Sequence, residues 1–418
     1  MTLPATLTVS INFSDGPGFG IPLTLDDPVK GLLDTGTLGA SSAAALVVDF
    51  SESTTAIAIR RGRNILQDTY DTGQATVKIL DPNGYFDPQN TSSPLFGYVQ
   101  PGRKLRISAN YSGTDYYLFS GYTSEYRYSY PVGQDIAYVT VTAFDAFKIF
   151  NTSAVTTVTG ASAGQSSGTR IGKILDQIGW PSSMRDVDTG TTPTLQADPG
   201  TSRTALSALK TVEATEFGAF YMSPSGDAVF QDRAFTAASI GATPTIFNQD
   251  GSGINYANLK FALDDKLIYN QANITRVGGT LQTASDATSI STYFAHTVTM
   301  DNLLMETNAD ALNLAQAYVA SRKDTSIRID AITLDLTTPS YSAGVTAGLN
   351  LDYFDPITVT NLQPSGSTIT KTLQVQGVSH DITPNSWITT FSTMEPILDA
   401  FILDSALYGI LDTSVLSY

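Results

Sequence analysis

Short runs in which apolar and polar residues alternate are the feature that most constrains the fold of this chain. In 104–111 every second residue is apolar, and the runs at 75–79 and 137–143 follow the same pattern. Turns rich in Gly, Asn and Pro separate these runs. A period of two between such turns predicts an antiparallel β-barrel or sandwich over residues 43–150.

The charge of the chain narrows the classes of function. Charged residues make up only 15% of the 418 residues, and 39 acidic against 23 basic residues give a net charge of −16. This balance argues against a protein that wraps nucleic acid, because phosphate contacts need clustered Lys and Arg. The negative charge does not exclude a protein that lines a pore through which DNA passes, because a mildly repulsive wall would reduce adhesion of the DNA.

Several kinds of site and segment are not expected. Cysteine is absent, which excludes disulfides and thiolate sites. No apolar run approaches the roughly 18 residues of a membrane helix, and the first basic residue is Lys30, so neither a membrane span nor a secretory signal is expected. No P-loop or dinucleotide-binding loop follows a strand, so no cofactor is expected.

Changes in composition and in the hydrophobic pattern divide the chain into five parts. An N-terminal strand and extension (1–42) precede the first β region (43–150), and a small α+β insert follows (151–252). A second β region (253–396) and a C-terminal docking segment (397–418) complete the chain. The predicted fold class is therefore mainly β, with two antiparallel β domains that flank an inserted α+β domain.

Local signals place helices and a hairpin in the second half of the chain. The insert has helical patterns at 170–180 and after Ser202, a plausible N-cap, and then a hairpin that turns at Pro224–Asp227. A further helix is expected over 308–323, with Asn308 as its cap and a stripe of Ala and Leu.

The sequence contains two internal similarities. The strand-Gly-strand-turn-strand pattern of 118–144 recurs faintly in 375–393. The terminal segments 25–40 and 403–418 match at seven of sixteen aligned positions. Duplicated terminal segments of this length are more typical of docking on a neighbouring surface than of a separate core, although common Leu and Asp residues could also match by chance.

The stretch "DPNGYFDP" contains two carboxylates, Asp81 and Asp87, that could suggest a cation loop or a catalytic pair. Its Gly is the fourth residue and its twelfth is Ser92, so the spacing does not fit an EF-hand. Nothing in the sequence indicates that either Asp is buried, which an acid/base pair would require. Pro-Asn-Gly is a strong turn sequence, and a turn is the favoured interpretation.

No complete catalytic set is found. Gly164–Gly168 matches G-x-S-x-G, but a small, polar segment precedes it in place of a strand. Ser207 and Lys210 match S-x-x-K without its companion motifs. The two histidines, His296 and His380, are too few for a typical zinc site, and His380 beside Asp381 is expected at a strand end on the surface. The sequence therefore predicts no catalytic, cofactor-binding or metal-binding residues.

Tyrosines are concentrated between residues 111 and 130. On alternating strands one face of such a segment can join the core while the other forms an interface or stacks on sugars. Protein–protein contact is favoured over sugar binding because interfaces are the commoner use of exposed Tyr.

Four motifs follow one another in the first β region: Arg61-Gly62-Arg63, a strand at 75–80, "FDP" from Phe86, and "PGRKLRI" from Pro101. With further motifs they form an ordered series across 55–396, which resembles the minor tail proteins of long-tailed, siphovirus-type phages that form the tail-tip or baseplate hub. Segments 174–190 and 205–233 are similar to the inserted domain of that family, and segments 270–290, 353–360 and 375–393 to its second barrel.

The resemblance implies two tube-like antiparallel β-barrels per chain and a homotrimer that forms a pseudo-sixfold ring, similar to contractile-phage baseplate hubs. Such a ring would join the sixfold tail tube or distal tail protein to the threefold tip. It would surround the channel for the tape measure protein and for DNA, which passes without specific binding. Tail-tip fibres or other minor tail proteins would be further partners, in a virion component made in the host bacterial cytoplasm.

Two other functions compete with this structural role. A receptor- or carbohydrate-binding tail protein would use the Tyr-rich face and polar loops. A glycan-cleaving enzyme would have only scattered Asp and Glu residues to support it, so no enzymatic activity is expected.

Overall fold

The computed structural model describes residues 3–14, 16–19, 21–22, 36–37, 46–64, 69–130, 136–190, 194–238 and 242–395. Most of its regular structure is β-strand, as the alternating runs predict. The terminal repeat 25–40 lies almost wholly outside the described residues, and its partner 403–418 and the docking segment 397–418 lie entirely outside them.

The regular structure described between residues 3 and 144 consists mainly of strands. They are β1 (Thr6–Asn12), β2 (Ile21–Pro22), β3 (Gly36–Thr37), β4 (Val47–Asp49), β5 (Thr54–Asn64), β6 (Thr69–Tyr70), β7 (Gln74–Leu80), β8 (Lys104–Tyr111), β9 (Thr114–Ser129) and β10 (Tyr138–Phe144). Along β7 and β10 every second residue is buried, which confirms the predicted period of two.

The insert mixes helices with short strands. Its elements are α1 (Phe147–Thr152), β11 (Ala154–Val155), α2 (Ser167–Gln177), β12 (Arg185–Val187), β13 (Arg203–Thr204), α3 (Ala205–Glu216), β14 (Ala219–Met222), β15 (Ala228–Gln231) and α4 (Arg233–Ala238). The hairpin β14–β15 turns at the predicted Pro224–Asp227. The predicted cap of α3 is wrong: Thr204, not Ser202, caps the helix by accepting the N–H of Ser207.

The last third returns to strands. These are β16 (Thr245–Asn248), β17 (Asn258–Ala262), β18 (Gln271–Arg276), β19 (Gln282–Ser285), β20 (Thr297–Leu303), β21 (Arg328–Asp335), β22 (Pro356–Leu362), β23 (Thr368–Thr383) and β24 (Ser386–Met394). Three helices interrupt them: α5 (Ala287–Tyr293), α6 (Asn308–Arg322) and α7 (Ser342–Asn350).

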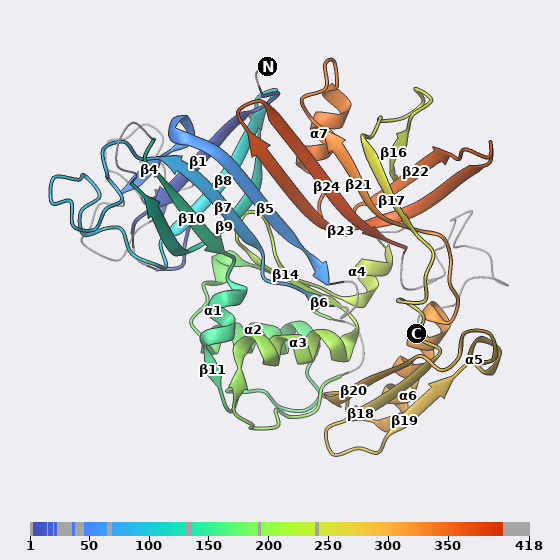
Figure 1. The fold of residues 1–418 in the computed structure, drawn as a ribbon. Helices are drawn as coiled ribbons and strands as arrows, with labels where there is room; N and C mark the ends of the chain where they lie inside the picture. Colours follow the sequence, from blue (N-terminus) through green and yellow to red (C-terminus); the bar gives the residue numbers. More distant parts are fainter. Residues whose placement is uncertain are drawn as a thin grey trace.

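A single 14-stranded sheet runs through both β regions (Figure 1). Its main path is β17-β21-β24-β23-β5-β7-β10-β9-β8-β1-β4, with β22 and β16 branching from β23 and β6 from β5. The two regions meet where β5 pairs with β23. Among the described residues this path is open at both ends, so the two closed barrels that the resemblance implies are not confirmed.

The second β region repeats the topology of the first. In chain order β1, β5, β7, β8, β9 and β10 correspond to β16, β17, β21, β22, β23 and β24. Neighbours also correspond, because β5-β7-β10-β9-β8-β1 matches β17-β21-β24-β23-β22-β16. Four of the five neighbour pairs are antiparallel in both copies, and only the last differs, since β1–β8 is antiparallel and β16–β22 is parallel. The faint sequence echo is thus confirmed as a structural repeat.

Fine detail of the backbone supports the repeat. The β9–β10 and β23–β24 pairs each contain a β-bulge, at Ser124 and Gln376 respectively. Just before each bulge the same hydrogen bonds recur: the N–H of Gly102 donates to the carbonyl of Thr123, and the N–H of Phe354 to that of Val375. Gly102 and Phe354 also share a positive φ, of 86° and 68°. A conformation that suits glycine is imposed on Phe354 by its place in the repeat.

A separate small sheet interrupts the second copy. Strands β18, β19 and β20 form their own three-stranded sheet, and α6 covers it with Ala311, Leu314, Ala315 and Tyr318 (Figure 1). The strand expected at about 270–276 in the second β domain therefore lies outside the main sheet. The predicted cap of α6 is also wrong. The N-cap is Thr307, one residue before Asn308, and it forms a capping box with Asp310.

Candidate functional site

The two nucleophile-like motifs have structural roles. Within Gly164–Gly168, Ser166 is the N-cap of α2 and accepts the N–H of Thr169. In the S-x-x-K motif, Ser207 is exposed, whereas the ammonium of Lys210 lies 2.9 Å from Glu213 Oε2 and donates to the carbonyl of Phe220. Neither serine has a general base among its described hydrogen-bond partners.

The histidines also lie apart, but His380 is not at the surface as predicted. It lies within β23 and is buried, where Trp387 Nε1 donates to its Nδ1 at 3.3 Å. Burial, with the charges of Arg61 and Arg60, lowers the pKa of His380 to about 3. His380 is therefore a neutral core residue at physiological pH.

The loop that begins at Asp81 is a turn, as expected, although Asp81 is buried rather than exposed. Its carboxylate accepts the backbone N–H groups of Tyr85 (2.7 Å) and Phe86 (3.1 Å) and the hydroxyl of Tyr130 (2.8 Å). The carboxylate thus stabilises the connection between two strands. The carboxylate of Asp87 accepts the N–H of Gln89 within the same turn, and among the described residues no hydrogen bond joins it to Asp81.

The Tyr-rich strand β9 presents two faces, as the alternation allows. Tyr122 is buried and its hydroxyl donates to the carbonyl of Pro17. Tyr117, Tyr128 and Tyr130 are exposed, and the rings of Tyr128 and Tyr130 stack with centroids 5.9 Å apart. The exposed rings lie toward the two ends of β9 rather than in one continuous platform.

The feature with the greatest functional weight is the junction between the two copies of the repeat. Strand β5 uses one edge for β7 and the other for β23, so that residues 57–62 pair with 377–382. Ile59 and His380 face each other here, and both are buried. On the outer face Arg60 Nη2 contacts both carboxylate oxygens of Asp381, at 2.7 and 2.8 Å. This pairing joins the two copies in one continuous sheet.

Two glycines bring the strands of the junction together. Gly62 and Gly377 are directly opposed. A Cβ on Gly377 would lie 3.0 Å from Gly62 Cα and from the carbonyl of Arg61, and would collide with Ser392 Oγ. The backbones could not approach this closely with any side chain at this position.

We expect Gly377→Val to lower the free energy of unfolding by about 2 kcal/mol or more, because the side chain would overpack the junction. Urea unfolding followed by circular dichroism measures this change. Gly172→Ala is the matched control: a Cβ there meets no atom within 4 Å in helix α2, so a small gain in stability is expected. An equal loss in both variants would contradict a special role for Gly377.

A largely buried cluster of side chains beside the junction connects the first β region, the insert and the second β region. It comprises Arg61, Tyr70, Lys210, Tyr221, Asp352 and Tyr353, and we call it the junction cluster. Arg61 Nη2 lies 2.9 Å from Asp352 Oδ1, and the guanidinium carbon lies 5.1 Å from the ring centroid of Tyr353. Tyr70 packs between Tyr353 (4.8 Å between centroids) and Tyr221 (5.3 Å).

Burial and neighbouring charges shift the pKa values of ionisable groups in and beside this cluster. Burial lowers the pKa of Arg61, but Asp352 and Tyr353 outweigh it, so the pKa is raised above its ordinary value. Nearby, the carboxylate of Asp145 accepts the N–H groups of Gly73 (2.6 Å) and Phe147 (3.0 Å). Burial raises the pKa of Asp145 to about 7 despite these bonds and the charges of Arg61 and Lys210. The cluster fixes how the two copies and the insert are oriented.

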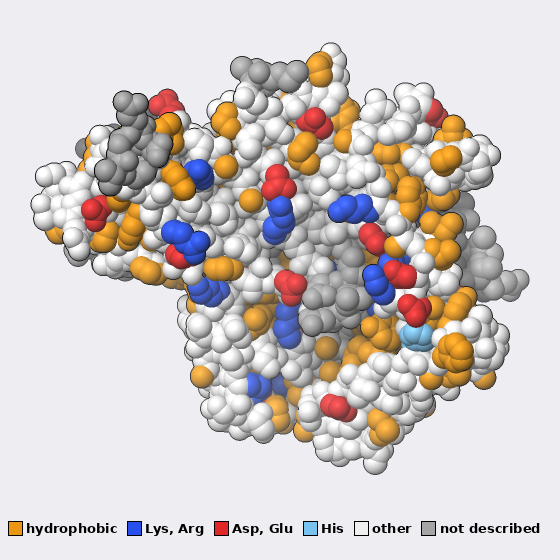
Figure 2. All heavy atoms as spheres, viewed as in Figure 1, with side chains coloured by type: hydrophobic (Ala, Val, Ile, Leu, Met, Phe, Trp, Pro, Cys, Tyr) orange, Lys and Arg blue, Asp and Glu red, His pale blue; other side chains and the backbone are white. Residues whose placement is uncertain are grey.

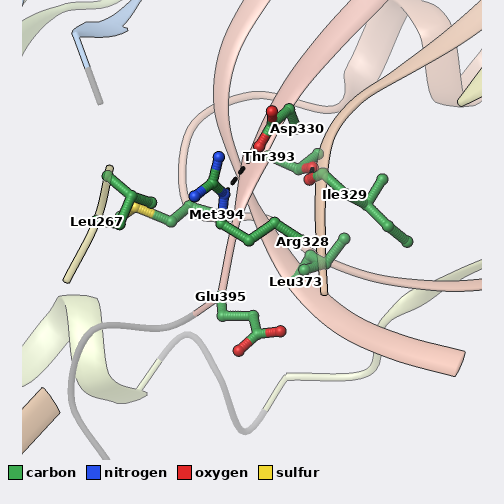
Figure 3. Close-up of a pocket in the computed structure, with 8 residues that line it drawn as sticks. All are labelled: Leu267, Arg328, Ile329, Asp330, Leu373, Thr393, Met394 and Glu395. Carbon is green, nitrogen blue, oxygen red and sulfur yellow. Dashed lines mark hydrogen bonds and ion pairs between the residues drawn. The ribbon is translucent and has the colours of Figure 1, made fainter. Parts of the chain in front are cut away.

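No ligand-binding chemistry emerges elsewhere in the described part of the chain. A small pocket is lined by Arg328, Asp330 and Glu395, among others (Figure 3). Arg328 already pairs with Asp330 and with Asp264. In the ranges that the structure describes, no three His, Asp or Glu residues gather in a way that could hold a metal ion. Nor does any helix there have the length and apolarity to cross a membrane.

Comparison with solved structures identifies the fold. The chain superposes on the tail protein from Neisseria meningitidis MC58 with a TM-score of 0.58 and 11% identity, over 94% of this chain and 96% of that one. It also superposes on the 43 kDa tail protein of prophage MuSo2 from Shewanella oneidensis, with a TM-score of 0.55 and 12% identity, over 84% of this chain and 96% of that one. The chain has the fold of phage tail proteins.

This fold likeness confirms, at the level of structure, the resemblance drawn from the sequence motifs. It covers nearly the whole chain and therefore includes both copies of the repeat and the insert. No protein-family model matches the sequence, and no curated protein matches it significantly. At 11–12% identity the similarity is therefore one of fold.

Proposed function

We propose that this chain is a structural component of a phage tail, a hub subunit that forms a trimeric ring with pseudo-sixfold symmetry. The observation that carries the proposal is the six-strand repeat, whose two copies are joined by the β5–β23 junction. Three chains with two copies each would present six similar sheets around one axis. Such a ring could contact a sixfold tail tube on one side and a threefold tip on the other.

The sheets of the ring would close into tube-like barrels only when subunits meet. An isolated chain leaves the path of its sheet open at β17 and β4 among the described residues. Exposed strand edges are unfavourable in a protein that remains alone, because their N–H and C=O groups invite further pairing. The open sheet therefore supports an assembled rather than a monomeric state.

The channel of the ring would accommodate the tape measure protein and then DNA. A net charge of −16 would disfavour adhesion of DNA to the wall. Expected neighbours are a distal tail protein or tail-tube ring above and tail-tip fibres or other minor tail proteins below. The exposed pair Tyr128 and Tyr130 is the observation that favours a second candidate, binding to a carbohydrate receptor.

We expect the purified chain to form trimers that appear in negative-stain images as threefold rings with a central hole. Mass photometry across a concentration series measures the stoichiometry, and a mixture with the neighbouring tail-tube protein supplies a second ring for assembly. A chain that stays monomeric in both settings would contradict the hub proposal. Glycan binding that is lost in Tyr130→Ala, with no ring in any sample, would favour the receptor-binding candidate.

A further inference from the structure

We infer that the contact between neighbouring subunits copies the β5–β23 junction, with β17 of one subunit pairing antiparallel with residues 125–130, the end of β9 and Tyr130, in a second copy of the chain. This inference rests on the proposed ring and adds the strands, their register and the residues in contact. The argument follows from the repeat, because the first copy contributes β5 to the junction and the second contributes β23. The equivalent strands, β17 and β9, have no such partner among the described residues.

Both edges are free in the part of the chain that the structure describes. Strand β17 pairs only with β21, and it ends the main path of the sheet. Strand β9 pairs with β8 up to Tyr122 and with β10 from there to Ser129, which leaves its second edge open beyond Thr123. In β23 the equivalent stretch, 377–382, is where β5 lies.

The register of the new pairing can be transferred from the junction. The bulges align Ser124 with Gln376, so Tyr128 takes the place of His380. The pairing of β5 with β7 and of β17 with β21 aligns Ile57 with Leu259. The β17–β21 register shifts after Lys260, where β21 has the extra residue Asp330, so the count is continued along β17 itself and Phe261 takes the place of Ile59. Ile59 faces His380 in the junction, and Phe261 would accordingly face Tyr128, with Leu263 opposite Tyr126.

The exposure of these side chains fits the missing partner. Ile59 and His380 are 0% and 3% exposed in the junction, whereas Phe261 and Tyr128 are 40% and 42% exposed and Leu263 is 67% exposed. Hydrophobic side chains gather at the end of the molecule where β16, β17 and β22 lie (Figure 2). A cross-strand aromatic pair is among the more stabilising contacts between antiparallel strands.

The two edges are also placed for head-to-tail assembly. In Figure 1, β17 lies toward one end of the sheet and β10, the inner neighbour of β9, toward the other, with the junction between them. Each subunit thus offers one edge of each kind, and such heterologous contacts build a ring when the rotation closes. A second copy of the chain is therefore the occupant.

One end of the pairing departs from the template. The positions of Gly62 and Gly377 correspond to Asp264 and Glu125, which would face each other. Each already has an arginine beside it, since Arg328 lies 2.6 Å from Asp264 and Arg127 lies 2.9 Å from Glu125. The close glycine contact of the junction is thus replaced by a mixed charged cluster, which makes this contact looser than the one within the chain.

Cysteine cross-linking tests the register directly, because the chain contains no cysteine. We expect Tyr128→Cys combined with Phe261→Cys to yield covalent dimers and trimers on oxidation or with a short bismaleimide. The off-face control combines Arg127→Cys with Phe261→Cys, which would point to opposite sides of the sheet. Ala58→Cys with Asp381→Cys, opposed within the junction, should instead link inside one chain and leave the mass on denaturing gels unchanged.

A second variant tests the same contact without cross-linking. Phe261→Lys should weaken ring assembly about tenfold or more in mass photometry while the melting temperature of the monomer stays the same. Leu281→Lys, at an exposed site directly before β19 of the small separate sheet, should leave assembly unchanged.

The outcomes separate this inference from the ring itself. If the unaltered chain forms rings but the Tyr128→Cys/Phe261→Cys variant cross-links no better than the off-face control, the strand pairing is wrong and the hub proposal still stands. A chain that never forms rings would overturn both. Rings that persist in Phe261→Lys would equally contradict the pairing.

Discussion

Arg61→Ala is expected to lower the free energy of unfolding by roughly 3 kcal/mol, the low end of the range for a broken buried ion pair, because only one of the two partners is fully buried. The side chain of Arg61 is 6% exposed, and its partner Asp352 is 30% exposed. The substitution would leave Asp352 with less compensation and would remove the cation from the face of Tyr353. Because Arg61 links the two copies of the repeat, unfolding should also become less cooperative. Chemical denaturation followed by both tryptophan fluorescence and circular dichroism measures these effects.

Arg60→Ala is the matched control on the same strand. Arg60 points to the opposite face and pairs with Asp381, and the two side chains are 54% and 52% exposed. Exposed ion pairs contribute about 0–1 kcal/mol, so a small loss is expected. A double variant that adds Asp352→Ala to Arg61→Ala should lose less than the sum of the single losses. Equal losses for Arg60→Ala and Arg61→Ala would contradict the role assigned to the junction cluster.

The strands were predictable because burial on one face leaves a direct trace in the sequence. β7, β8 and β10 follow the alternating runs closely, since a slip of one residue would expose every apolar side chain. The strand at 271–276 was also recognisable, but its sheet was not. Alternation records which face is buried and carries no information on which neighbour supplies the covering layer.

The ends of the helices were harder to place, because tertiary contacts choose among several possible caps. Ser202 and Thr204 can both cap α3, but Arg203 and Thr204 pair with β11 and remain extended, so the helix begins after Thr204. At α6 the reciprocal bonds between Thr307 and Asp310 select Thr307 over Asn308. Local preference allowed both choices, and the surroundings decided.

The junction could be predicted only in part. The motif Arg61-Gly62-Arg63 contributed to the family resemblance, but its partner Asp352 lies 291 positions away in the sequence and nothing local connects them. The burial of His380 did have a signal, because the period of two places it on the same face as Val378 and Ile382. Asp381, which points outward to Arg60, led to the expectation of a polar surface instead.

The pH dependence of stability offers a second large effect, in which His380 and Asp145 act in opposite directions. The pKa of His380 is lowered from 6.5 to about 3, so the unfolded chain binds one more proton than the native protein between these values. His380 therefore contributes stability that is complete above pH 6.5 and is lost as the pH falls. The pKa of Asp145 is raised from 3.8 to about 7, so its contribution is complete below pH 3.8 and is lost as the pH rises through 7.

In the unaltered protein the two effects largely cancel between about pH 4 and 6.5, since one more proton on the unfolded chain is balanced by one more on the native protein. Single substitutions should separate them, with a slope of about 1.4 kcal/mol per pH unit for each uncompensated proton. Relative to the unaltered protein, His380→Asn should lose stability as the pH rises from 4 to 6.5. Asp145→Asn should instead gain stability relative to the unaltered protein as the pH rises from 4 to 7.

Urea unfolding at unit steps from pH 4 to pH 8 measures both slopes, and the double variant provides the internal control. It lacks both groups, so its stability should run parallel to that of the unaltered protein between pH 4 and 6.5, with a constant offset from the two lost side chains. A single variant whose stability also runs parallel would show that the substituted group has nearly the same pKa in the folded and unfolded chain. For His380 that result would contradict the conclusion that burial holds the side chain neutral, and for Asp145 the conclusion that burial keeps the carboxyl protonated.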